Sequence, residues 1–296
     1  MKAFTILTDK HYLDRGIALY ESIDRLMECD YRFYYLCLDR YTFNIIAKIN
    51  NKTLIPVYIE DEFCDNKGFE LLVKNNQSVP MGFSKFHFAL SAFFTNYIME
   101  KESPESVMYI DADILFYHSP EIVSKYMKGK SIGLILHRHN KIGAKVGGFN
   151  TGIIYFRGDS IGRKALKWWR DVVIDPNNKW HETYGGFADQ KYLELFPVLF
   201  GKENVKILDD DIGHGAPWNF PLYKYFSDRG KIRWNGRIQL LVFNHFARFS
   251  YDNNSYDVRR NKINWKNFSL EKYPLVKRYY DDYFEILKDV KKRHEL

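Results

Sequence analysis

Two aspartates, Asp111 and Asp113, interrupt an otherwise apolar run at residues 107–117 (VMYIDADILFY). The flanking residues are β-branched, aromatic or aliphatic, which is typical of a buried central strand in a parallel sheet. Residues two apart on a strand point to the same side, so we expect both carboxylates on one face with Cα atoms about 6.6 Å apart. Because a buried carboxylate is costly unless it is paired or bound to a metal, the run predicts a cation site.

The cation that suits such a pair is Mg²⁺ or Mn²⁺, since both prefer oxygen ligands from carboxylates and phosphates. A second apolar run at residues 239–243 (QLLVF) predicts a strand that ends at Asn244 and His245. An imidazole at that end is a candidate third ligand and would favour Mn²⁺, whereas a hydrogen-bonded core histidine is the alternative. A cation held there would neutralise a departing diphosphate.

Other polar side chains lie where a substrate could reach them. Asp189 follows a Gly-rich turn and either points into a cleft or caps its own helix. Asn150 and Asn219 are expected in loops, where they either contact sugar hydroxyls or serve ordinary turn chemistry. Lys85 is a candidate phosphate contact. Each of these positions therefore has a functional and a structural interpretation.

The loop after the first expected strand is a candidate nucleotide site. Thr8, Asp9 and Tyr12 lie there, in LTDKHY. They could bind a base by hydrogen bonding and stacking, and ordinary loop residues are the alternative.

The elements that must position these residues alternate along the chain. The expected strands cover residues 2–8, 31–38, 53–59, 107–117, 131–136, 153–156, 205–208 and 239–243. The expected helices cover residues 15–27, 43–49, 84–99, 161–173 and 273–292, with Asp159 as a cap for the fourth. This order predicts a doubly wound α/β sheet, in which ligands lie at the carboxyl ends of strands.

Composition narrows the functional class. The chain has 296 residues, 46% of them hydrophobic, and a net charge of +7, which fits an anionic substrate or surface. It contains neither a GxGxxG after the first strand nor a P-loop motif, which argues against dinucleotide redox chemistry and P-loop NTPases. Three cysteines without a CxxC pair, no signal peptide and no apolar run of membrane-spanning length favour free thiols in the cytoplasm.

Several blocks together resemble a known family. LTDKHY, YIDADILFY, GGFNTGIIYFR, FADQKYLELFP and FNHFARF are similar to GT-A-fold glycosyltransferases of the family-8 type, and to a bacterial branch of nucleotide-sugar transferases. The resemblance spans most of the chain. It implies a GT-A fold: a Rossmann-like, doubly wound mixed sheet flanked by helices, with a C-terminal helical extension.

The resemblance also implies roles for individual residues. The metal set would be Asp111, Asp113 and His245, the nucleotide loop Thr8, Asp9 and Tyr12, and the sugar-site blocks Asn150, Gly152, Asp189 and Gln190. The family pattern continues after HF with a glycine and then Lys-Pro-Trp, which this chain lacks. Arg248 is the candidate to supply the missing diphosphate charge. Family-8 enzymes retain anomeric configuration, and the resemblance carries that expectation.

The expected function is a cytoplasmic, metal-dependent hexosyltransferase of surface polysaccharide synthesis. Its co-substrate would be a nucleotide diphosphate sugar, UDP-linked, its cofactor Mn²⁺ or Mg²⁺, and its acceptor a glycan or lipid-linked glycan, with no nucleic acid involved. The alternatives are a sugar-nucleotide hydrolase, a nucleotidyltransferase or a non-catalytic binding protein. We expect a catalytic domain at residues 1–250 and an extension at 251–296 whose aromatic, basic helix either packs on that domain or faces an anionic membrane.

Overall fold

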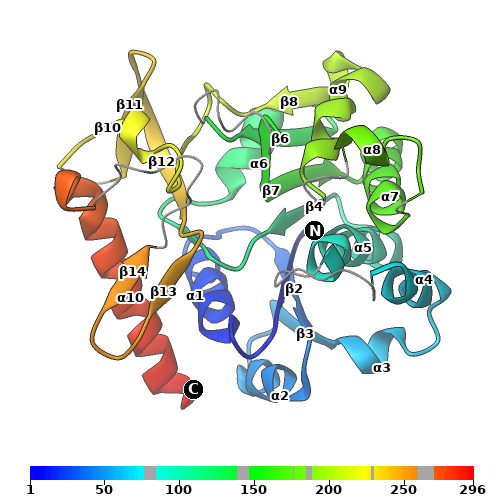
Figure 1. Cartoon of the computed structure of the whole chain (residues 1–296), viewed down its shortest axis with the longest axis horizontal. Coiled ribbons are helices and arrows are strands. Elements are labelled where there is room, and N and C mark those ends of the chain that lie inside the picture. Colours follow the sequence, from blue (N-terminus) through cyan, green and yellow to red (C-terminus); the bar gives the residue numbers. More distant parts are fainter. Residues whose placement is uncertain (77–84, 139–146, 176, 185–188, 228–229, 259–269) are drawn as a thin grey trace.

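A mixed seven-stranded sheet forms the centre of the computed structural model, which describes residues 1–76, 85–138, 147–175, 177–184, 189–227, 230–258 and 270–296 (Figure 1). Its strand order is β3-β2-β1-β4-β7-β6-β8. The strands are β1 (Lys2–Thr8), β2 (Tyr31–Cys37), β3 (Leu54–Tyr58), β4 (Ser106–Ile110), β6 (Ile132–Leu136), β7 (Phe149–Arg157) and β8 (Val205–Ile207). The first four are mutually parallel, and β7 runs antiparallel to both of its neighbours.

Helices cover both faces of this sheet. They are α1 (Leu13–Asp24), α2 (Arg40–Lys48), α3 (Ile59–Phe63), α4 (Lys67–Asn76), α5 (Lys85–Glu102), α6 (Glu121–Met127), α7 (Ser160–Ile174), α8 (His181–Tyr184) and α9 (Phe196–Leu199). Short 3₁₀ turns cover Lys191–Leu195, Lys202–Asn204, Phe220–Leu222 and Leu270–Lys272. Strand alternation divides the core in two, since Phe4 and Ile6 join the α1 side and Ala3 joins the α5–α7 side. The expected cap is confirmed, because Asp159 accepts hydrogen bonds from Ile161 N and Gly162 N.

A second sheet lies beside the first. It contains β10 (Lys224–Tyr225), β11 (Lys231–Trp234), β12 (Arg237–His245) and β5 (Ile114–Phe116), and β9 (Gly213–Gly215) pairs with β12. A hairpin of β13 (Phe249–Tyr251) and β14 (Tyr256–Val258) follows. The chain first passes from one sheet to the other between β4 and β5.

The expectation of one continuous strand over residues 107–117 is wrong. β4 ends at Ile110 and β5 begins at Ile114, and a turn between them is closed by Ile114 N donating to the Asp111 carbonyl at 3.2 Å. β4 pairs with β1 and β7, whereas β5 pairs with β12 of the other sheet. The two aspartates therefore meet in a turn between sheets and not on one face of a strand.

A second correction concerns Asn150, which was expected in a loop, and Gly152, which was expected just before the strand at residues 153–156. Both lie within β7, whose ladder with β6 already includes Asn150 opposite Ile135. The glycines before them suggested a loop, but pairing with two neighbouring strands extends β7 to Phe149.

The C-terminal helix α10 (Pro274–His294) packs on the core (Figure 1). Its buried side includes Tyr279, Tyr280 and Tyr283, which join the same hydrophobic cluster as α1. Of the two interpretations of the tail, packing on the domain is the one that the structure shows. The expected domain boundary at residue 250 falls inside β13, and it stays a prediction. In the described part of the chain, no helix is both long and apolar enough to cross a bilayer.

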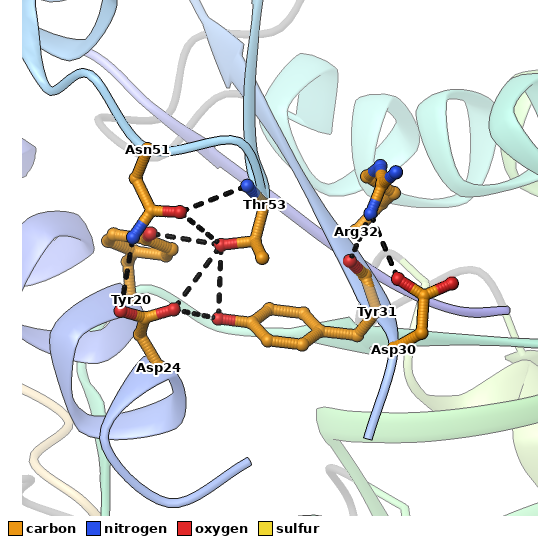
Figure 2. A network of polar contacts seen from close by, with 7 residues as sticks. All are labelled: Tyr20, Asp24, Asp30, Tyr31, Arg32, Asn51 and Thr53. Carbon is orange, nitrogen blue, oxygen red and sulfur yellow. Dashed lines mark hydrogen bonds and ion pairs between the residues drawn. The ribbon is translucent and has the colours of Figure 1, made fainter. Parts of the chain in front are cut away.

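A polar network joins the end of α1 to the amino ends of β2 and β3 (Figure 2). The Asp24 carboxylate accepts hydrogen bonds from Tyr31, from Thr53 Oγ1 at 3.3 Å and from Asn51 Nδ2 at 3.2 Å. Thr53 also exchanges a hydrogen bond with Tyr20 Oη at 3.1 Å, and burial raises the pKa of Tyr20 to about 12. The network therefore lies at the sheet edge opposite to the carboxyl ends of β1 and β4.

Candidate metal and substrate site

Three side chains that are far apart in sequence converge where the two sheets meet. His245 Nε2 lies 3.0 Å from Asp113 Oδ1 and 3.7 Å from Asp111 Oδ2. One ligand atom from each of the three residues lies within 4.8 Å of the others. The structure thus brings together the residues expected to bind a metal.

Backbone pairing places each of these groups. His245 is the last residue of β12 and pairs with Ile114, the first residue of β5, directly after the turn. Asp113 O accepts from Phe246 N at 2.7 Å, and Asp111 N donates to Gly152 O at 2.9 Å. The turn is therefore held from both sides, by β12 and by β7.

The charges in this group perturb one another. Burial raises the pKa of Asp111, although the charge of His245 opposes it. Burial acts on Asp113 in the same direction, but the charge and hydrogen bond of His245, together with Arg15, outweigh it and lower the Asp113 pKa. Burial alone would lower the pKa of His245, and the two carboxylates more than reverse this. Two carboxylates thus share one imidazole as their immediate counter-charge.

The donor set fits a hard or borderline divalent cation. Two carboxylates and one imidazole are suitable ligands for Mn²⁺, and both carboxylates remain partly open to solvent on one side. His245 Nδ1 is buried without a hydrogen-bond partner among the described residues, so the imidazole is not held as an ordinary satisfied core histidine. Because ligands must be deprotonated, cation binding would displace any proton that His245 carries.

Gly152 explains how β7 can approach the group so closely. A Cβ added at this position would lie 2.8 Å from His245 Nδ1 and 2.5 Å from Asn150 Oδ1. Real Cβ contacts are longer, so any larger residue would displace the imidazole or the amide. The glycine therefore serves close backbone approach.

The residues expected at the sugar site cluster next to the metal group. Asp189 is buried, accepts a hydrogen bond from Ser91 Oγ at 3.3 Å, and lies within electrostatic reach of Asp111. Burial, and then the charge of Asp111, raise the pKa of Asp189 well above its usual range. Asn150 Nδ2 donates to Gln190 Oε1 at 3.3 Å, which links the two expected amides.

The loop after β1 is held by local hydrogen bonds. Thr8 was expected in this loop but is the last residue of β1, because it pairs with Cys37 of β2; it is buried, and its hydroxyl shares a hydrogen bond with Tyr35 Oη at 2.8 Å. Asp9 Oδ1 accepts from His11 N at 2.9 Å. The half-buried Tyr12 lies close enough to Asp113 for that charge to contribute, after burial, to a raised Tyr12 pKa. Of the three expected residues, Tyr12 thus lies within electrostatic reach of the metal group.

Arg15 is a residue that the sequence analysis missed. Its guanidinium lies 4.5 Å from the Tyr12 ring centroid and donates to the His11 carbonyl at 3.1 Å and to the Phe249 carbonyl at 3.1 Å. The side chain is buried, and its charge contributes to the lowered pKa of Asp113. Arg15 thus connects the loop after β1 to the first residue of β13. The sequence pattern placed Arg15 only at the start of an amphipathic helix and did not predict a contact with the site.

The remaining candidates lie in different settings. Asn219 is fully buried and bonds to Ala216 N at 2.8 Å and to the His137 carbonyl at 3.2 Å, so both ends of its amide have backbone partners. Arg248 is exposed in the turn after β12, with a backbone φ of +63°. The side chain of Lys85, at the start of α5, is outside the described residues.

Trp218 and His137 extend the site with aromatic surface. The Trp218 ring lies edge-on to His245 with centroids 5.2 Å apart, and His137 lies 5.3 Å from Trp218. His137 Nε2 is also 3.2 Å from Asn150 Nδ2. The sequence APWN marks a loop, and only the fold shows that its tryptophan borders the metal group.

Comparison with known proteins agrees with this architecture. The galactosyltransferase LgtC, solved with donor and acceptor sugar analogs, superposes with a TM-score of 0.55 over 97% of this chain and 95% of LgtC, at 14% identity. Mouse xyloside xylosyltransferase 1 gives a TM-score of 0.54 over 83% of this chain and 97% of that one, also at 14% identity. The chain has the GT-A glycosyltransferase fold. The fold that the sequence blocks predicted is thereby confirmed.

Comparison by sequence adds less. An uncharacterized protein of Bacillus subtilis, YfnF, is 25% identical over 259 residues, which cover 83% of this chain and 80% of YfnF. No family model matches the chain.

Proposed function

We propose that this chain is a metal-dependent glycosyltransferase that moves a hexose from a nucleotide diphosphate sugar, UDP-linked, to a glycan or lipid-linked glycan acceptor. The observation that carries the proposal is the group of Asp111, Asp113 and His245 at the carboxyl end of β4, beside the loop that follows β1. In open α/β sheets this is where ligands bind. The GT-A fold supports the same reaction class.

In this proposal the metal group is the diphosphate end of the site. Asp111, Asp113 and His245 would hold Mn²⁺ or Mg²⁺, which when bound would supply positive charge to the departing diphosphate. Arg15 holds the Tyr12 loop against this group and adds a second positive charge near Asp113. It thus compensates in part for the absent Lys-Pro-Trp.

The sugar end would be formed by Asp189, Asn150 and Gln190. With a raised pKa, the Asp189 carboxyl keeps a proton more readily and can donate a hydrogen bond to a sugar oxygen. The hydrogen bond between Asn150 and Gln190 keeps both amides in one orientation. These groups would orient the donor hexose, with Asp189 nearest the reacting carbon.

Ligand-dependent thermal stability tests the donor class. UDP and UDP-sugars with Mn²⁺ should raise the melting temperature by several degrees, because a ligand at a hundred times its Kd stabilises by about 2.7 kcal/mol. Other nucleoside diphosphates and Mn²⁺ alone serve as comparisons. The absence of stabilisation by any nucleoside diphosphate would contradict the proposal.

Product analysis separates transfer from its alternatives. With a donor that binds, hexose transfer should depend on an added glycan or lipid extract and should release the nucleoside diphosphate. Retention of configuration would appear as an anomeric coupling in the product that matches that of the donor. Release of free sugar regardless of acceptor would indicate a hydrolase, and formation of a sugar-1-phosphate would indicate a nucleotidyltransferase.

A further inference from the structure

β10, β11 and the first residues of β12 form a three-stranded antiparallel unit, called here the hairpin. This hairpin has two contrasting faces. Residues that pair across its strands lie on the same side, as do residues two apart along one strand. Tyr225, Ile232 and Gln239 are paired in register across the three strands and are all buried. One side of this hairpin therefore packs on the protein, and the opposite side faces solvent.

The solvent side combines cations with large aliphatic side chains. Lys224 pairs with Arg233, which pairs with Ile238, and Lys231 pairs with Leu240. All five are exposed, Ile238 at 57% and Leu240 at 41%. We call these five residues the hairpin face; none of them is acidic. Figure 1 shows β11 and β12 extending away from the seven-stranded sheet, so the face is not shielded by that sheet.

We propose that the hairpin face docks on an anionic lipid bilayer. Exposed isoleucine and leucine side chains on a strand can enter the interface between headgroups and acyl chains, and neighbouring lysine and arginine side chains meet the phosphates. An anionic bilayer matches both features, because its phosphates attract Lys224 and Arg233 while its apolar interior accepts Ile238 and Leu240. A chain with a net charge of +7 would be attracted to it from a distance.

The structure points away from the aromatic side of α10 as the contact. That side is buried in the core, and several cations of the helix have acidic partners: Arg293 bonds to Glu21 at 2.6 and 2.7 Å, Lys288 bonds to Glu285, and Lys277 bonds to Asp281. The aromatic side of the helix therefore offers no apolar surface to a bilayer. The aromatic and basic composition that suggested membrane contact through the tail serves packing instead.

Docking at the hairpin face would orient the site. β12 runs without interruption from Arg237 to His245, so Ile238 lies about 23 Å along the strand from the metal ligand at about 3.3 Å per residue. Docking would therefore fix the distance between the metal ligands and the bilayer surface. The link to a lipid-linked acceptor rests on the proposed function, whereas docking does not.

Cosedimentation with vesicles tests the proposal without any enzyme assay. The full-length protein should bind vesicles of equal parts phosphatidylglycerol and phosphatidylcholine, should not bind phosphatidylcholine alone, and should bind less at high salt. Replacing Lys224→Glu and Arg233→Glu together should weaken binding at least about 25-fold, since each cation near an anionic surface contributes about fivefold.

Two further variants distinguish docking from general charge attraction. Lys48→Glu with Lys52→Glu changes the net charge equally, at two exposed positions of α2 and the following loop, and should bind nearly as well as the unchanged protein. Ile238→Ser with Leu240→Ser should weaken binding about tenfold without altering the net charge. Equal binding by the hairpin and α2 charge variants, full binding by the serine variant, or no binding by the unchanged protein would overturn the proposal. Unchanged melting temperatures for all variants would show that the differences arise at the surface.

Discussion

Two polar clusters lie at opposite ends of the strands of the seven-stranded sheet, and their half-buried carboxylates have different partners. Asp24, at the amino ends of β2 and β3, accepts hydrogen bonds from Tyr31, Thr53 and Asn51 (Figure 2). Asp111 and Asp113, at the carboxyl end of β4, share the His245 imidazole, whose other nitrogen has no partner among the described residues. We infer that the first cluster stabilises the fold and that the second keeps charge available for a ligand.

The largest effect is expected when the two carboxylates at the carboxyl end of β4 are neutralised. Asp111→Asn with Asp113→Asn should reduce Mn²⁺-dependent transfer about 1000-fold or more, because the variant loses both carboxylate ligands. The melting temperature should change little, because the lost ion pair between Asp113 and His245 offsets the removal of the unfavourable charge of Asp111. Activity and melting curves on the same preparations check both effects. Normal turnover in this variant would show that the group is structural.

A second test compares two glycines of one sequence block, Gly152 and Gly148. Gly152→Ala should lower activity about 100-fold, because the added methyl displaces His245 or Asn150 and small misplacements of reacting groups have effects of this size. Gly148→Ala is the matched control, since its Cβ would meet only Glu194 Oε1 at 3.8 Å. Titration of Mn²⁺ with each variant would show whether affinity falls together with rate. Similar losses in both variants would mean that the close approach of Gly152 to His245 is not the cause of the lost activity.

At the amino ends of β2 and β3, we expect a substitution to lower stability and leave activity unchanged. Asp24→Ala removes the acceptor of the Tyr31 hydroxyl and the Asn51 amide, whereas Thr53 still donates to Asn51 Oδ1 at 2.9 Å; the free energy of unfolding should fall by about 2 kcal/mol. Activity per folded molecule should be unchanged. Denaturant unfolding and a turnover assay below the transition check this pair of outcomes. A loss of turnover with unchanged stability would contradict the division of roles between the two clusters.

The smallest effect is a pH-dependent gain in stability at Asp189. The folded pKa of this carboxyl is raised above its unfolded value of about 3.9, so the folded state is destabilised as pH rises above that value. Asp189→Asn removes this cost and should stabilise the protein by about 1 kcal/mol at pH 8 and by nothing below about pH 4. Melting curves across this range test the sign. A gain that is constant with pH would mean that the charge of Asp189 is not its source.

The sequence alone determined much of the local structure, because the relevant signals are short in range. Runs of β-branched and aromatic residues located β1, β2 and β6, and the apolar stripe of α10 located that helix. The Asp159 cap was read from adjacent residues alone. The sequence also singled out Asp111, Asp113 and His245 as candidate metal ligands, and the structure brings these three side chains together.

Only the tertiary structure decided how these parts meet. Strand propensity cannot tell whether the run at residues 107–117 stays in one sheet or crosses into another. The structure ends β4 at Ile110, because the residues after the turn pair with β12 as β5. Pairing likewise drew Asn150 into β7, and core packing, not composition, chose the side on which α10 lies. Arg15 and Trp218 acquired their places at the site in the same way. Each depends on contacts between residues distant in the chain, which no local pattern records.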